Sequence, residues 1–457
     1  MKKFTKKELK GFSQNQLIEI ILKFQDGMEQ LKISIAKSQK DSSNSSKPPS
    51  TDVNKKRIFS LREKSENPVG GQKGHKGKTK RQVDNPDEIV QHLPNLICQE
   101  CGQKLSSNDQ YIAEKRQDFD IPKPTVIVTE HQKIGIKCKC GNCNYGKFPD
   151  DIKSSVQIGK NIKSFMVYLN IYQSIPYKRL SKLSKDILGF DISQRSIEKI
   201  LTLAAKKGGS IYENLKEKIK NMSWLGSDET WINVNGKKMY KWVWQNSAGV
   251  FYIIGDRSFK MIKIFFGGKE IYSGTMISDC YAAQLKTKTK NGKQICLVHI
   301  HRDLKFLIDS QNFYWAKRLK KLLKKAVRAR EKIWQPETSQ AKREQIISFF
   351  ESKLDKLLSN LPSHASKDAK NLQKRLLKYK NSVFKFMHYP DLPFHNNSSE
   401  QAIRIAKIKQ KISGGFRTKK GAQNYSILLS IIESAKRENV QILDAINQLM
   451  SNKLVLA

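Results

Sequence analysis

The sequence contains no long apolar segment. A helix that crosses a membrane needs about 18 consecutive apolar residues, and no run in this chain approaches that length. Residues 1–10 also lead into no uninterrupted apolar stretch of the kind found in secretion signals. These two absences exclude an integral membrane protein and a secreted one, and we therefore expect a cytoplasmic protein.

Acidic residues are also scarce. The 457 residues include 42 aspartates and glutamates but 85 lysines and arginines, which gives a formal net charge of +43. An excess of this size predicts a polyanionic partner, whose phosphates the protein contacts independently of sequence and with an affinity that falls steeply with salt. The alternative is a charge that serves solubility alone. The length is sufficient for two or three domains.

Cysteines are few and unevenly placed. Their number is odd, and five of the seven fall into two tight groups, in the order Cys98, Cys101, Cys138, Cys140, Cys143, Cys280 and Cys296. This pattern excludes the disulfide framework of a small secreted domain. Two Cys-x-x-Cys turns separated by a strand-like segment instead predict a zinc ribbon, with one structural Zn²⁺ on Cys98, Cys101, Cys140 and Cys143. Cys138 is an alternative ligand, and four thiolates leave no open position for chemistry.

The amino-terminal residues 1–40 have the pattern of one helix. Ser13 and Gln16 have the spacing of a capping box, and apolar residues follow at alternating steps of four and three: Leu17, Ile21, Phe24, Met28, Leu31 and Ile35. This seam predicts a short coiled coil and a homodimer or higher oligomer. The alternative is an amphipathic helix packed on its own chain. Residues 41–88, rich in serine, proline, glycine and lysine, should form a flexible basic linker.

Two further domains follow the linker. Residues 89–152 contain the grouped cysteines and should form the zinc-binding domain, and residues 153–222 are helical in pattern. Within the second, one helix should end at Gly189 and Ser193 should cap another, which is the layout of a helix-turn-helix. Arg195 and Lys199 would then point outward, towards a DNA major groove. The alternative is a helix pair that only packs.

Residues 223–298 are rich in strands. An apolar run at residues 223–234 leads directly into Asn235-Gly236, a strong signal for a hairpin. Strands are then expected at residues 238–246, 250–255, 271–280 and 294–298, with helices at residues 257–267 and 281–288. The order is βββαβαβ. Asp228 lies on the first strand and Asp279 at the end of the fourth, although Glu229 and Asp256 compete on position.

This order of elements resembles the ribonuclease H-like core that transposases and retroviral integrases share. Distinctive segments support the resemblance, namely residues 228–230 (DET), 278–283 (SDCYAA), 296–303 (CLVHIHRD), 395–404 (HNNSSEQAIR) and 413–417 (SGGFR). Together they resemble the transposases of the insertion-sequence 66 family over nearly the whole chain. The implied fold is a multidomain α+β protein, whose catalytic core at residues 223–302 and 393–457 is interrupted by an all-α insertion at residues 303–392.

The resemblance also implies a chemistry. Asp228, Asp279 and Glu400 match the family's DDE triad, which would hold two Mg²⁺ or Mn²⁺ ions for phosphodiester hydrolysis and transesterification. The implied function is that of a bacterial transposase acting on double-stranded DNA, both at the terminal inverted repeats of the element and at the target. Accessory proteins of the same element are further candidate partners.

Several basic residues near the triad should contact DNA. Arg404 and Lys407 share a helical face with Glu400, and Arg417 follows two glycines in a segment suited to phosphate contact. Arg302 and His299 should line the active site, although a buried histidine is the alternative. Cys296-x-x-His299 has no further pair of ligands nearby in the sequence, so a second metal site is not expected there.

Two other functions compete with this interpretation. A catalytically inactive DNA-binding repressor derived from a transposase would explain the charge and the domains, but not three intact acids. A ribonuclease acting on RNA–DNA hybrids would explain the acids, but not the zinc-binding segment, the heptads or the helical insertion. The chain also departs from the common family pattern at Ser399 and Gln401, neither of which is an expected metal ligand.

Overall fold

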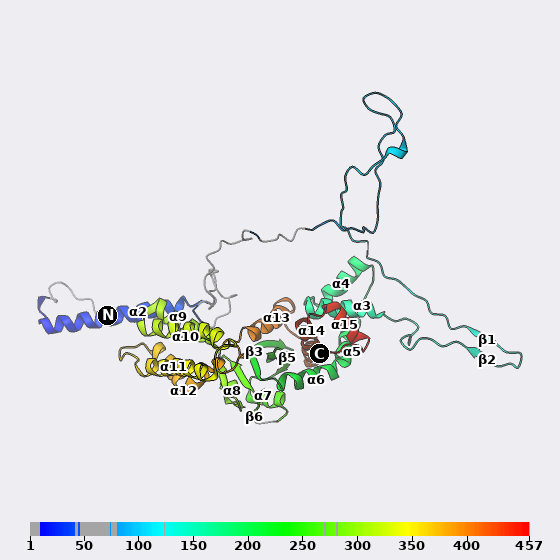
Figure 1. Cartoon of the computed structure of the whole chain (residues 1–457). Helices are drawn as coiled ribbons and strands as arrows, with labels where there is room; N and C mark the ends of the chain where they lie inside the picture. The colour runs from blue at the N-terminus through cyan, green and yellow to red at the C-terminus, as the bar shows by residue number, and fades with distance from the viewer. Residues whose placement is uncertain are drawn as a thin grey trace.

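The computed structural model describes residues 10–41, 44–45, 74, 80–122, 124–268, 271–279 and 282–456. It is a mixed α/β protein in which a central mixed sheet lies between two groups of helices (Figure 1). The predicted linker of residues 41–88 lies mostly outside the described residues, as do Cys280 and Tyr281. Within the part of the chain that the structure describes, no helix has the length and apolar character needed to span a bilayer.

Helix α2, Gln14–Ser38, begins at the predicted capping box. The backbone N–H of Gln16 donates to Ser13 Oγ at 3.3 Å, and the backbone N–H of Ser13 donates to Gln16 Oε1 at 2.8 Å. Near its carboxyl end the helix contacts its own chain, where Lys37 pairs with Asp368 at 3.0 Å. The heptad seam remains open to solvent: Ile21, Phe24 and Leu31 are each more than half exposed. The coiled coil therefore stays a prediction.

The helical domain contains α3 (Lys160–Val167), a π-helical turn η3 (Tyr168–Tyr172), α4 (Tyr177–Leu188), α5 (Gln194–Lys207) and α6 (Gly209–Lys220). Helix α4 ends at Gly189, whose φ of 61° is the left-handed conformation that favours glycine. Ser193 caps α5 by accepting from the backbone N–H of Ser196. The two predicted helices are confirmed, and Arg195 and Lys199 are exposed on α5.

The central sheet has the strand order β5-β4-β3-β7-β9. Its strands are β3 (Trp224–Val234), β4 (Lys237–Asn246), β5 (Gly249–Gly255), β7 (Thr275–Ser278) and β9 (Lys293–Ile295). Strands β3, β4 and β5 are antiparallel neighbours, whereas β7 and β9 run parallel to β3. Asn235 and Gly236 both have positive φ, 52° and 72°, as the predicted hairpin requires. A separate pair, β6 (Ile271–Tyr272) and β8 (Lys288–Thr289), is parallel.

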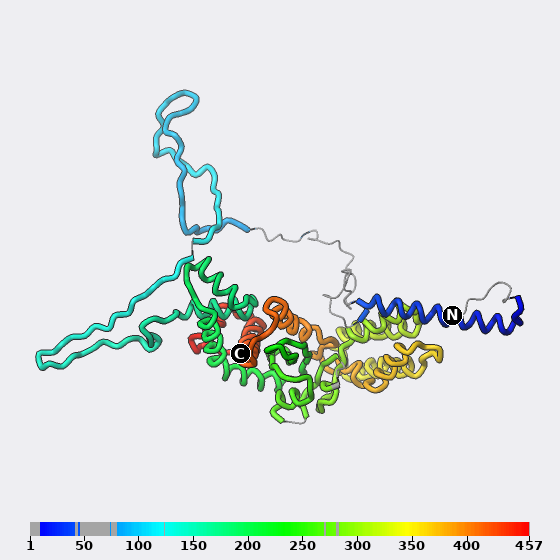
Figure 2. Tube along the Cα trace, turned by 180° about the vertical axis from the view of Figure 1, so that it is seen from behind, coloured from blue at the N-terminus to red at the C-terminus, as the bar shows by residue number. Residues whose placement is uncertain are grey.

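Different helices cover the two faces of this sheet. One face, which includes Val243 and Tyr252, packs against α13 (Asn397–Ser413) and α14 (Lys419–Arg437), with α15 (Ile442–Met450) behind them. The other face, which includes Trp242 and Trp244, packs against α6 and α7 (Phe259–Phe266), and the short α8 (Ala282–Lys286) follows β7. The view from behind shows the same layers (Figure 2). Alternate residues of β3 and β4 therefore face different groups of helices.

The fifth predicted strand, at residues 294–298, is wrong at its carboxyl end. Strand β9 ends at Ile295, and α9 (Leu297–Gln311) begins after the N-cap residue Cys296. The apolar run here is too short to distinguish strand from helix by periodicity. In the structure, Leu297, Ile300 and Leu304 are buried at helical spacing against the insertion. Helix α9 therefore runs through the boundary predicted between residues 302 and 303.

The remaining insertion helices are α10 (Tyr314–Ile333), α11 (Gln340–Ser359) and α12 (Lys367–Lys378), followed by the 3₁₀ turns η4 (Lys380–Ser382) and η5 (Lys385–Met387). They share one apolar core with α9. In Figure 1 they lie at the end of the molecule that also carries α2. The insertion is thus a helical body attached directly beside the sheet.

Lys241 on β4 is fully buried, between the rings of Tyr252 and Tyr425 at 4.4 and 4.2 Å. Among the described residues its Nζ has no hydrogen-bond partner, and burial lowers its pKa well below the ordinary value. We expect Lys241→Met to raise the free energy of unfolding at pH 7 by about 1–3 kcal/mol, because it removes this desolvation cost.

The stability that Lys241→Met gains over wild type should decrease as the pH rises. Between its lowered folded pKa and the unfolded value of 10.5, the lysine binds more protons in the unfolded state, so wild-type stability increases with pH in that window. Urea unfolding of both proteins at pH 7 and pH 10 measures the difference. A Lys241→Met protein that is less stable than wild type at pH 7 would contradict this account.

Candidate active site

The three predicted triad residues come from three elements that meet at the middle of the sheet, beside its central strand β3. Strands β3 and β7 are parallel neighbours with Gly226 opposite Ile277, which brings Asp228 and Asp279 together just beyond that pair. Glu400 lies in the first turn of α13, the helix that crosses β3. Each acid is only partly accessible to solvent. The fold therefore gathers carboxylates that are far apart in the sequence.

The electrostatics of the site reflect this crowding. Burial raises the pKa of Asp228 well above its ordinary value, and the negative charges of Asp279, Glu229 and Glu400 raise it further. Burial also raises the pKa of Asp279, against the lowering effect of His299. Glu400 Oε1 is buried without a hydrogen-bond partner among the described residues. Such a group of oxygen ligands fits a hard divalent cation, whose charge would relieve the repulsion.

Two side chains of α9 lie beside the acids. His299 Nδ1 is 3.4 Å from Asp279 Oδ1, and its Nε2 is 3.9 Å from Glu400 Oε1. Arg302 Nη1 lies 3.8 Å from the same oxygen of Glu400. The structure thus places both residues at the acidic group, because α9 begins immediately after β9.

The sequence interpretation gave no role to Asn396, the N-cap residue of α13. Its Nδ2 donates to the carbonyl of Ser227 at 2.8 Å and to Asp279 Oδ1 at 3.3 Å. Asn396 therefore ties the start of α13 to both acid-bearing strands. The only sequence signal was its position in the segment HNNSSEQAIR.

Glu229, the competing acid, faces away from Asp228. It pairs with Trp242, and Asp228 with Val243, in the register of β3 with β4, so the two carboxylates lie on opposite faces. Glu229 accepts from Arg257 Nη2 at 2.9 Å and from Gln284 Nε2 at 3.0 Å. Its carboxylate is thus already held by donors on the α7–α8 side of the sheet. Asp256 instead accepts from Ser258 in the turn before α7.

The basic residues predicted to contact DNA occupy two regions. Arg404 and Lys407 are exposed along α13 after Glu400, and Arg417 is exposed beyond the end of that helix. Arg195 and Lys199 are exposed on α5 in the helical domain, where Arg195 also pairs with Glu198 at 2.6 Å. The structure brings Arg302 to the acids and leaves the other five on the surface.

The glycines before Phe416 lie where the chain pairs with the end of β3, and the predicted phosphate contact stays a prediction. The N–H of Phe416 donates to the carbonyl of Asn233 at 2.8 Å, and the N–H of Asn235 donates back to the carbonyl of Phe416 at 2.7 Å. A Cβ on Gly415 would lie 2.4 Å from the Asn233 carbonyl oxygen, at a φ of 129°. Gly415 is therefore needed for the chain to pair with the end of β3.

The grouped cysteines form two similar turns. The N–H of Gly102 donates to the carbonyl of Cys98 at 3.0 Å, and the N–H of Gly141 donates to the carbonyl of Cys138 at 2.9 Å. Each turn thus begins with one cysteine and has a second immediately before a glycine of positive φ. Hydrogen bonds from the next cysteine of the same turn lower the pKa of Cys98 and of Cys138. This geometry favours Cys138 and Cys140 over the predicted Cys140 and Cys143 as the second pair of zinc ligands.

The structure does not bring the two turns together. The second turn lies at the tip of the hairpin β1 (Gly135–Lys137) and β2 (Cys143–Tyr145), and the first lies on a separate projection near η2 (Ser107–Asp109) (Figure 1). Among the described residues, these cysteines form no group of three or more potential metal ligands. A zinc site that joins the two turns therefore stays a prediction.

We expect Cys98→Ser and Cys138→Ser each to lower the zinc content of the purified protein by one ion per chain. Each substitution removes one of four thiolates from a structural site. Cys143→Ser is the matched control and should retain the ion, because Cys143 lies in β2 outside the turn. Elemental analysis after dialysis measures the content. Loss of zinc with Cys143→Ser but not with Cys138→Ser would contradict this choice and support Cys140 and Cys143, the pair predicted from the spacing.

Comparison with known proteins identifies the family. The model of the family described as Transposase IS66 family matches residues 155–424, which is more than half of the chain. Residues 5–81 match a family of unknown function, DUF6444. The uncharacterized protein y4jO of Sinorhizobium fredii (strain NBRC 101917 / NGR234) is 33% identical over 70 residues, which are 15% of this chain and 22% of that protein. The chain thus matches less than a quarter of that relative's length. Because the family model covers more than half of the chain, the chain belongs to the IS66 family of transposases.

Proposed function

We propose that this protein is an active DDE transposase that binds the terminal inverted repeats of its insertion sequence and catalyses metal-dependent DNA cleavage and strand transfer. The observation that carries the proposal is the convergence of Asp228, Asp279 and Glu400 from β3, β7 and α13. Burial and the charges of the neighbouring acids raise the pKa of Asp228, which supports a functional role for this group of carboxylates.

The sheet supports a ribonuclease H-like core. Three antiparallel strands are followed by two parallel ones, with the first strand, β3, at the centre of the order. Asp228 in the middle of β3 and Asp279 just after the end of β7 lie on neighbouring strands, and the third acid is supplied by a helix across β3. The helical insertion enters between β9 and α13, which accounts for the long separation of Asp279 and Glu400.

The three carboxylates fit two Mg²⁺ or Mn²⁺ ions, since these hard cations take oxygen ligands and keep several waters. When bound, such ions activate the attacking oxygen and stabilise the leaving oxygen of an in-line displacement. The protein's own groups position the acids: Asn396 holds Asp279 through a hydrogen bond. Arg302 places a positive charge beside Glu400.

Exposed basic residues supply the DNA contacts in this proposal. Arg404, Lys407 and Arg417 follow Glu400 along the surface, where they would contact phosphates near the scissile bond. Arg195 and Lys199 would enter a major groove from α5. The insertion adds a groove lined by Ile308, Lys317, Lys320, Lys321, Lys324, Lys325 and Arg328. The open heptad seam of α2 supports a dimer.

The decisive experiment uses the purified full-length protein and a DNA fragment that carries both ends of the element. With Mg²⁺ we expect nicks at the ends that leave 3′ hydroxyls, followed by joining of those hydroxyls to target DNA. Chelation of the metal should abolish both products. A protein that binds the ends but cuts them with neither Mg²⁺ nor Mn²⁺ would be the DNA-binding repressor instead.

A further inference from the structure

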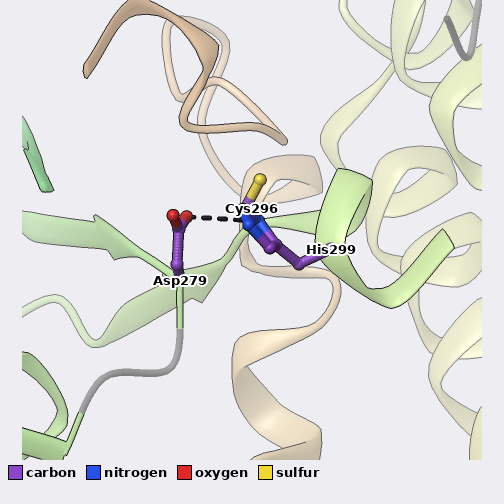
Figure 3. Close-up of side chains that lie close together, drawn as sticks. All are labelled: Asp279, Cys296 and His299. Atoms are coloured by element: carbon purple, nitrogen blue, oxygen red, sulfur yellow. Dashed lines mark ion pairs between the residues drawn. The ribbon is translucent and has the colours of Figure 1, made fainter. Parts of the chain in front are cut away.

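A second set of potential ligands lies against the catalytic acids. Asp279 at the end of β7, Cys296 at the N-cap of α9 and His299 in its first turn place one ligand atom each within 4.8 Å of one another (Figure 3). From the sequence, Cys296 and His299 lacked a third ligand. The parallel pairing of β7 with β9 supplies it, because Ser278 lies opposite Ile295.

The donor set differs in kind from that of the triad. A thiolate, an imidazole and one carboxylate are the ligands of Zn²⁺ and of cations like it, whereas Mg²⁺ takes oxygen alone. We propose that Asp279, Cys296 and His299 bind one zinc-class cation beside the catalytic acids, and that this cation inhibits cleavage by occupying Asp279. The inhibition rests on the proposed function, but the binding does not.

The surroundings of Cys296 and His299 suit a metal site. Cys296 is 1% exposed, and its Sγ accepts a hydrogen bond from the backbone N–H of Asn396 at 3.3 Å, a contact of the kind that steadies a metal-bound thiolate. His299 Nδ1 points at Asp279 and has no hydrogen-bond partner among the described residues. Its Nε2 lies towards Glu400 and Arg302, so Nδ1 is the nitrogen left for a cation.

The charge balance also favours a cation. The Cys296 thiol lies within 4.8 Å of the acidic Asp279, and a thiol ordinarily holds its proton at neutral pH. Binding of a divalent ion forms a metal–sulfur bond and releases that proton to solvent, with no change of oxidation state. Three partly buried acids nearby attract the ion. Mg²⁺ and the zinc-class ion would then compete for Asp279.

Cobalt is the probe for the binding test, because Co²⁺ occupies zinc sites and a thiolate ligand gives it a characteristic charge-transfer absorption. Three full-length proteins are titrated with Co²⁺: the wild type, Cys296→Ser and His299→Gln. We expect each variant to bind one Co²⁺ fewer per chain, with affinity at this site lowered on the order of 100-fold. Cys98→Ser removes cobalt bound in the amino-terminal turns, and Asp228→Asn leaves the three ligands intact, so both should keep this site. Circular dichroism verifies that each variant is folded.

The inhibition test adds Zn²⁺ to the Mg²⁺-dependent cleavage reaction. Zinc should reduce wild-type cleavage at least tenfold, while Cys296→Ser, measured against its own zinc-free rate, should lose less than half of its activity. Cobalt absorption and stoichiometry that are the same in wild type, Cys296→Ser and His299→Gln would overturn the site, whatever the activity. Cobalt bound through these residues in a protein that cuts no DNA would support the site while overturning the proposed function.

Discussion

Asp228→Asn, Asp279→Asn and Glu400→Gln should each lower the rates of DNA cleavage and strand transfer by roughly 10⁴-fold. Each substitution keeps the shape of the side chain but removes the charge that holds a divalent cation. Binding to the ends of the element should survive, because the exposed basic residues of α5, α10 and α13 are unchanged. Cleavage assays and gel-shift titrations of the same preparations measure the two effects.

Asp228→Asn and Asp279→Asn should be at least as stable as wild type without metal. The folded state raises the pKa of Asp228 and of Asp279, so their charged forms destabilise it above those values, and an uncharged amide avoids that cost. Thermal unfolding in the presence of a chelator tests this expectation. A large loss of stability would mean that the acids are structural, and the activity assay would then carry no information about catalysis.

Glu229→Gln is the control on the same strand. Glu229 faces the opposite side of the sheet from Asp228, and glutamine keeps its shape, so the substitution leaves the three triad carboxylates in place. Activity should stay within about tenfold of wild type. If Glu229→Gln is inactive while Asp228→Asn still cuts, the triad is wrong. If all four variants cut normally, the acids are not catalytic.

Gly226→Ala should lower activity by roughly 100-fold, although Gly226 contacts neither DNA nor metal in the proposed mechanism. A Cβ there would lie 2.5 Å from Gln245 Nε2, 2.8 Å from Ser399 Oγ and 3.1 Å from Asn396 Oδ1. Ser399 and Asn396 belong to the start of α13, so the added methyl group pushes that end of the helix away from β3. Glu400 would move with it, away from Asp228.

The free energy of unfolding should also fall, by about 1–3 kcal/mol, because the contact is buried and tightly packed. Gly209→Ala is the matched control: it lies at the start of α6, and a Cβ there meets nothing within 4 Å. That protein should cut DNA at the wild-type rate and be no less stable. Wild-type cleavage by Gly226→Ala would show that α13 tolerates displacement.

The sheet could be predicted well because its signals are local. Asn235-Gly236 adopts the two positive φ values that its sequence implies, and the strands on either side alternate between the two faces. The order around Asp279 was only partly right, because the predicted strand at residues 271–280 is two strands, β6 and β7, which belong to different sheets. The predicted helix at residues 281–288 ends at Lys286, and β8 begins at Lys288. The placement of Glu400 beside the two aspartates rested on the resemblance alone, since no local pattern relates residues 279 and 400.

The contacts that complete the site could not be predicted, because they join distant segments. Asn396 reaches Asp279 across the whole insertion, and the start of α9 depends on the core that Leu297 enters. The closeness of Gly415 to Asn233, which makes a glycine necessary there, likewise joins segments that are far apart in the sequence. Spacing also could not decide between Cys138 and Cys143, and the hydrogen bond of the turn at Cys138 adds an observation that the sequence lacks.

Helix α9 has its first turn at the catalytic acids and its last turn in the insertion. Its 15 residues form a rod of about 22 Å, and a tilt of a few degrees about the end near Glu400 would move the far end by roughly 2 Å. One continuous helix thus joins the insertion to His299 and Arg302. In the proposed function, DNA bound by the lysines of α10 would therefore act on α9, which packs against α10 and begins beside the catalytic acids. DNA binding and DNA cleavage would then be mechanically coupled.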